Sequence, residues 1–211
     1  MPLTDLAWPR RTARLLLRPA EVRDAEAVWA FVGRPKVARW TSLPGVTWRE
    51  FRERYDDPDR RADRLVVELG GVVVGDLGVW VADGWSQVAV RGAAAATEAS
   101  LGWSLDPAHH GRGLATEAVA ELLEVCLAPP PGGLGLRRVT ASCFAANEPS
   151  WRLMERVGMR REAHAVRDSL HAELGWLDGL TYALLADERR GGSPDGRSRQ
   201  PDSRGRSSSA T

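Results

Sequence analysis

The stretch "DPAHHGRGLATEAVAELLEVC", residues 106–126, sets two glycines around an arginine directly before an amphipathic run. The run predicts a helix because its apolar residues recur at the spacing of one helical face. That face comprises Ala115, Ala118, Val119, Leu122, Leu123 and Cys126. The first N–H groups of a helix have no acceptor within it and lie at the positive end of its dipole. We therefore expect an anion to bind here.

The segment before this helix supplies the groups that a phosphate site needs. Gly111 and Gly113 let a bulky anion approach the main chain. The expected donors are the N–H groups of Arg112, Gly113, Leu114, Ala115 and Thr116, the Arg112 guanidinium and the Thr116 hydroxyl. The alternative is that the two glycines serve only the geometry of a tight turn between a strand and a helix.

Two other phosphate-binding motifs fit this stretch less well. A dinucleotide fingerprint has a third small residue where Thr116 stands, and an acid about 20 residues further on. Residues 131–138 contain no acid. A Walker loop needs Gly-Lys followed by Ser or Thr, and that sequence is absent.

A second motif, "NEPSWRLMERVGMRREA", spans residues 147–163 and predicts a strand-to-helix junction. Asn147 and Ser150 flank the expected start of the helix, and Gly158 ends it. The alternative reading is that Asn147 only caps the helix and Ser150 is an ordinary residue of its first turn.

The remaining elements predict a mixed α/β chain. The expected order is a strand, two helices, a hairpin turning at Gly70-Gly71, a strand, a helix, a strand, a helix and two strands. Helices that alternate with strands in this way favour a twisted sheet with helices on both faces.

The composition is that of one ordinary globular domain, with 43% hydrophobic and 27% charged residues. We expect a loose lead-in over residues 1–11, the folded domain over 12–188, and a disordered Arg/Ser/Gly-rich tail over 189–211. The net charge of +1 favours neither a specific nucleic acid nor a membrane. Two cysteines, without a signal peptide or an apolar span, favour the cytoplasm.

Together, the two motifs resemble the GNAT (general N-acetyltransferase) superfamily, and its RimJ/RimL-like branch most of all. The resemblance covers about residues 12–187, and "RLLLRP" near the start and "GWLDGLTYALLADE" near the end also match that branch. It implies the GNAT fold, here a twisted mixed sheet of six to seven strands with helices on both faces.

The resemblance implies acetyl-coenzyme A as the acetyl donor. The family's pyrophosphate loop, Q/R-x-x-G-x-G/A, maps onto His110, Gly113 and Ala115, and His110 departs from the usual Gln or Arg. The strand before the loop is expected to splay from its neighbour and to bind the pantetheine arm. The residues at its end are Trp103, Ser104 and Leu105, and an N–H near Leu105 is expected to polarise the thioester carbonyl.

The implied reaction is direct transfer of an acetyl group to a primary amine, of a protein N-terminus or of a small molecule. By analogy with the family, Asn147 lies beside the pantetheine and Ser150 returns a proton to the coenzyme thiolate. Glu98 is the candidate base because its strand leads into the loop; the alternative is a surface carboxylate.

Three further expectations concern partners and pockets. No metal is expected, because the histidines lack ligand spacing. Among the tryptophans, Trp40, Trp48 and Trp85 are candidates for an acceptor pocket, and an exposed sheet edge could support a homodimer. The alternative function is a regulatory or partner-binding module that binds coenzyme A without transferring an acetyl group.

Overall fold

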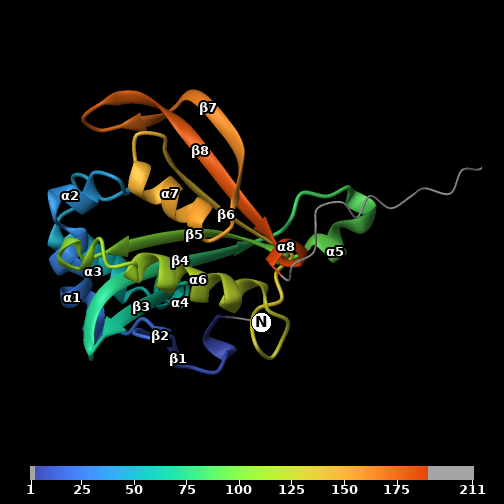
Figure 1. The fold of residues 1–211 in the computed structure, drawn as a ribbon, viewed down its shortest axis with the longest axis horizontal. Coiled ribbons are helices and arrows are strands. Elements are labelled where there is room, and N and C mark those ends of the chain that lie inside the picture. Colours follow the sequence, from blue (N-terminus) through green and yellow to red (C-terminus); the bar gives the residue numbers. More distant parts are fainter. Residues whose placement is uncertain (1–2, 190–211) are drawn as a thin grey trace, which may run out of the picture.

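One continuous sheet of eight strands organises the computed structural model, which describes residues 3–189 (Figure 1). The strands lie in the order β1-β2-β3-β4-β5-β6-β8-β7, and every neighbouring pair is antiparallel except β5 and β6. Their bounds are β1 Arg10–Arg11, β2 Leu16–Pro19, β3 Arg64–Leu69, β4 Val72–Ala82, β5 Glu98–Leu105, β6 Arg138–Phe144, β7 Arg160–His171 and β8 Gly175–Leu185.

Helices cover both faces of this sheet. Their bounds are α1 Ala25–Val32, α2 Pro35–Ala38, α3 Trp48–Asp56, α4 Pro58–Ala62, α5 Arg91–Ala94, α6 Leu114–Leu127, α7 Glu148–Arg156 and α8 Ala186–Arg189. Short 3-10 turns lie at Leu3–Asp5, Val22–Asp24, Val88–Val90 and Pro107–His109. The predicted fold class, mixed α/β with helices on both faces, is confirmed. The strand count is eight rather than six to seven, because a two-residue strand carries no sequence pattern.

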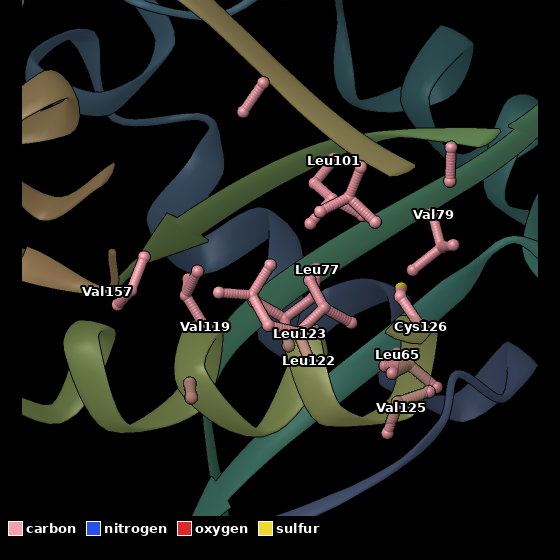
Figure 2. Packing of buried hydrophobic residues seen from close by; sticks show 14 of the residues in the cluster. Leu65, Leu77, Val79, Leu101, Val119, Leu122, Leu123, Val125, Cys126 and Val157 are labelled. Atoms are coloured by element: carbon pink, nitrogen blue, oxygen red, sulfur yellow. The ribbon is translucent and has the colours of Figure 1, made fainter. Parts of the chain in front are cut away.

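The alternation along β3 shows how the two layers form. Leu65 and Val67 face the core that α6 covers, and Val66 between them faces a second core formed with α1 and α3. On α6, the predicted stripe packs onto the sheet, and Val119, Leu122 and Leu123 project from the helix toward the strands (Figure 2).

The two expected ends of the domain are described in part. Leu3 and Leu6 are only 7% and 5% exposed and join the α6 core, so these two residues of the expected lead-in pack onto the domain. The predicted tail lies outside the described residues, apart from Arg189. Arg189 closes α8 and forms an ion pair with Glu124 of α6. No helix within residues 3–189 has the length and apolar character to cross a bilayer.

Candidate active site

The strands β5 and β6 separate after a short parallel contact. Only residues 98–100 of β5 pair with residues 138–140 of β6. Beyond that point β5 continues along β4 as far as Leu105, whereas β6 continues along β8 as far as Phe144. The facing edges of the two strands therefore carry backbone N–H and C=O groups that no neighbouring strand uses. The splay expected before the loop is present, and it ends at Trp103, Ser104 and Leu105.

The loop beyond β5 presents a run of free amides. Gly111 and Gly113 have φ values of +73° and +74°, a left-handed conformation that glycine adopts without strain. Within residues 3–189, the six consecutive N–H groups from Gly111 to Thr116 donate to no protein acceptor, and the next amide, of Glu117, bonds Gly113 O. A Cβ on Gly111 would meet no atom within 4 Å, so this loop is open to solvent. Main-chain donors of this kind fit a diphosphate.

Side chains on both sides hold this loop in place. The Nε2 atom of His110 lies 3.0 Å from Leu105 O, and Arg14 Nη1 donates to Arg112 O at 2.8 Å. Arg14 also forms an ion pair with Glu117 in the first turn of α6. The sequence did not indicate Arg14, because 98 residues separate it from Arg112 and no local motif connects them.

The second motif lies on the β6 side of the splay, across from β5. Asn147 is the residue before α7, and Ser150 lies in the first turn of that helix. The Ser150 hydroxyl lies beside the Cys143 thiol on β6. Burial raises the pKa of Cys143 to about 11, and the neighbouring Ser150 hydroxyl only partly offsets this. A thiol in this state is a poor nucleophile at neutral pH, which agrees with direct transfer rather than an acyl-cysteine.

Glu98 is not brought together with these residues. It begins β5, whereas the loop follows the other end of the strand, about 23 Å away at about 3.3 Å per residue. Its carboxylate pairs with Arg137 and lies 3.9 Å from Arg138. Glu98 is thus a paired carboxylate at the closed end of the splay, and its role as the base stays a prediction.

The three tryptophans occupy different places. The ring of Trp40 lies 6.3 Å from that of Phe144, at the end of β6, and 5.4 Å from the His171 ring. Trp48 packs within the second core, and Trp85 is 94% exposed. Only Trp40 therefore lies near the open end of the splay.

Comparison with known proteins agrees with this geometry. The sequence family described as the acetyltransferase (GNAT) domain matches residues 14–160. A Bacillus subtilis protein, the uncharacterized N-acetyltransferase YnaD, is 26% identical over 182 residues, covering 84% of this chain and 96% of its own. A GNAT-family acetyltransferase from Bacillus anthracis superposes with a TM-score of 0.69 at 26% identity, covering 85% of this chain and 99% of its own.

A further similar structure is that of Mycobacterium smegmatis RimJ in complex with CoA-disulfide. It has a TM-score of 0.65 at 25% identity and covers 82% of this chain and 83% of its own. The chain belongs to the GNAT acetyltransferase family. Within that family it is similar to the RimJ/RimL-like branch, and it is an N-acetyltransferase that transfers an acetyl group to an amine.

Proposed function

We propose that the acetyl donor is acetyl-coenzyme A and that the six free amides at residues 111–116 bind its diphosphate. Those amides, together with the adjacent Arg14 and Arg112 side chains, provide a positively polarised surface for two phosphates. The unpaired edge of β5 supplies groups that can pair with the amides of the pantetheine arm. The observation that carries the proposal is this loop at the open end of the β5–β6 splay.

The end of β5 and the start of α7, on the two sides of the splay, supply the groups that act on the thioester. An N–H near Leu105 stabilises negative charge on the thioester oxygen as the amine attacks. The new C–N bond forms, the C–S bond breaks, and the Ser150 hydroxyl protonates the leaving thiolate. The proton that the amine nitrogen loses passes through a base or water and restores the Ser150 hydroxyl. Asn147, before α7, orients the pantetheine. Because the thioester is already activated, positioning supplies much of the rate enhancement.

The acceptor is a primary amine, either at a protein N-terminus or on a small molecule. An α-amino group has a pKa of roughly 7.7–8.0, against about 10.4 for a lysine side chain, so it is more often in the reactive free form at neutral pH. We place the reaction in the cytoplasm because both cysteines are free thiols. The homodimer stays a prediction, and the strand available for it is β7 at one end of the sheet.

The decisive assay measures thiol release from acetyl-coenzyme A across a panel of peptides, polyamines, amino acids and aminoglycosides. We expect release that depends on the acceptor, with a mass gain equal to one acetyl group on the acceptor. Tight coenzyme binding without such release, for every amine in the panel, would instead identify a regulatory or partner-binding module.

A further inference from the structure

The peptide that joins Arg112 to Gly113 carries one of the six free amides of the loop. Its N–H belongs to Gly113 and its C=O belongs to Arg112. Because the peptide is trans, these two groups point in opposite directions. Arg14 Nη1 donates to Arg112 O at 2.8 Å, so Arg14 lies on the carbonyl side of this peptide. The Gly113 N–H therefore points to the other side, away from Arg14.

The local backbone does not fix this orientation. A peptide rotates as a unit through ψ of the residue before it and φ of the residue after it, which here is Gly113. Its φ is +74°, but a glycine adopts negative φ about as readily. Rotation would turn the Gly113 N–H away and present the Arg112 carbonyl oxygen in its place. A carbonyl oxygen only accepts hydrogen bonds, so it cannot bind a phosphate oxygen.

The bond from Arg14 is the one hydrogen bond that this peptide makes within residues 3–189. It stabilises the orientation in which the Gly113 N–H is available to an anion. The contact joins residues that lie 98 positions apart, so it depends on the tertiary fold and not on the loop itself.

Glu117 fixes the Arg14 side chain on the carbonyl side. Arg14 Nε donates to Glu117 Oε2 at 2.7 Å, and Nη2 lies 2.6 Å from the same oxygen. Glu117 Oε1 accepts from the Arg14 backbone N–H at 2.8 Å and from the Thr12 hydroxyl. All three guanidinium nitrogens of Arg14 are therefore engaged, two by Glu117 and one by Arg112 O. Charge-assisted bonds on both sides give the side chain one defined position.

We propose that Arg14 is a positioning residue for the coenzyme, because its bond to Arg112 O keeps the Gly113 N–H directed toward the diphosphate. The inference rests on the acetyl-coenzyme A-dependent function proposed above. Thr12 and Glu117 contribute by holding Arg14 in place. This role goes beyond the charge that Arg14 adds near the loop, and it concerns the diphosphate end of the donor rather than the thioester end.

The test compares two donors that share the thioester and the pantetheine arm. Acetyl-coenzyme A carries the diphosphate, and S-acetylpantetheine lacks it. Steady-state assays on the best acceptor of the amine panel compare the full wild-type chain with Arg14→Met. We expect kcat/KM for acetyl-coenzyme A to fall about 10-fold or more, through KM and not through kcat. With S-acetylpantetheine, Arg14→Met should stay within about twofold of wild type, because no diphosphate is bound.

Two further variants allow for a loss of folding in Arg14→Met, which leaves the Glu117 carboxylate without its cation. The double variant Arg14→Met/Glu117→Gln removes the ion pair as a unit but still leaves Arg112 O without its donor. We expect it to keep the defect with acetyl-coenzyme A and to spare S-acetylpantetheine. Arg14→Lys should recover only part of the loss, because a single ammonium group cannot reproduce the planar fork that spans both partners.

The matched control is Arg10→Met. Arg10 lies on the same N-terminal segment, and its Nη2 donates to Gly132 O in the loop that follows α6. Arg10 thus makes the same kind of bond at the opposite end of the helix. We expect Arg10→Met to keep wild-type kinetics with both donors.

Three outcomes would count against the inference. A wild-type KM for acetyl-coenzyme A in Arg14→Met or in the double variant would overturn it. An equal loss with both donors, or a loss that Arg10→Met shares, would assign Arg14 a structural role only. If the wild-type chain neither bound acetyl-coenzyme A nor released its thiol, the proposed function would fail and the positioning role with it, whereas the first two outcomes leave that function intact.

Discussion

The Nε2 atom of His110 lies 3.0 Å from the carbonyl oxygen of Leu105. A carbonyl oxygen can only accept a hydrogen bond, so Nε2 carries the proton and donates it. This bond ties the first residue of the phosphate loop to the last residue of β5. The loop proposed to bind the diphosphate and the strand proposed to bind the pantetheine arm are thus fixed to each other.

His110→Ala should therefore weaken coenzyme binding about 5- to 10-fold, close to the value of one hydrogen bond that orders a site. His110→Gln supplies the family's usual residue at this position and should stay within about threefold of wild type. Titration calorimetry with coenzyme A measures both. Equal affinities for the Ala variant and wild type would show that the bond does not organise the loop.

Gly113→Asp should weaken coenzyme binding about 100-fold, equivalent to about 2.7 kcal/mol. The change places a negative charge among the amides and forces a left-handed φ of +74° on a residue with a side chain. The matched control is Gly70→Asp in the hairpin turn. Its φ is +60° and a Cβ there meets no atom within 4 Å, so it carries the same backbone strain away from the site. If both variants bind coenzyme like wild type, the loop is not the phosphate site.

Ser150→Ala should lower kcat about tenfold or more while the acetyl-coenzyme A affinity stays unchanged, because the hydroxyl acts on the leaving thiolate. Ser142→Ala is the control. Ser142 also lies on the splayed part of β6, but it is exposed and bonds Thr181 across the sheet. Rapid single-turnover assays would separate transfer from product release, and an unchanged transfer rate in Ser150→Ala would remove the serine from the mechanism.

Glu117 links α6 to the segment before β2. Burial opposes its ionisation, but hydrogen bonds from Thr12 and Arg14 outweigh this and lower the pKa of Glu117 below its ordinary value of 4.5. The stabilisation is therefore present above that value and is lost as the pH falls through the lower pKa of the folded state. Glu117→Gln should lower Tm by about 2–4 °C at pH 7 and by less below pH ~4.

Glu121, on the same helix, has a pKa shift of the opposite sign. Burial raises the pKa of Glu121, so its ionised form weakens the fold above the ordinary value. Glu121→Gln should consequently keep or raise Tm at pH 7. Thermal unfolding followed by circular dichroism from pH 3 to 8 tests both variants, and a pH-independent difference between wild type and Glu117→Gln would contradict the assignment.

Local patterns predict much of this fold. The capping box of Thr47 and Glu50 starts α3, and Gly70-Gly71 turns the hairpin of β3 and β4, because each depends on residues close in sequence. The stripe on α6 likewise follows from its own period. The two-residue strand β1 and the burial of Leu3 depend on distant partners, which no local pattern records.

The candidate site, too, was predictable from the sequence only where its residues form short local motifs. The loop at residues 110–116 and the pair Asn147 and Ser150 form short motifs, and both lie at the open end of the splay. Glu98 shows what a local pattern cannot predict. It is close to the loop in sequence, but the extended strand β5 separates Glu98 from the start of the loop by about 23 Å.

The most direct test of the central claim is calorimetric titration of the full chain with acetyl-coenzyme A at pH 7. The claim is that the main-chain amides of residues 111–116, at the start of α6, bind the diphosphate of the donor. It predicts saturable binding at one site per chain in wild type and loss of that binding in Gly113→Asp but not in Gly70→Asp. Folded wild-type protein that takes up neither acetyl-coenzyme A nor coenzyme A would contradict the account.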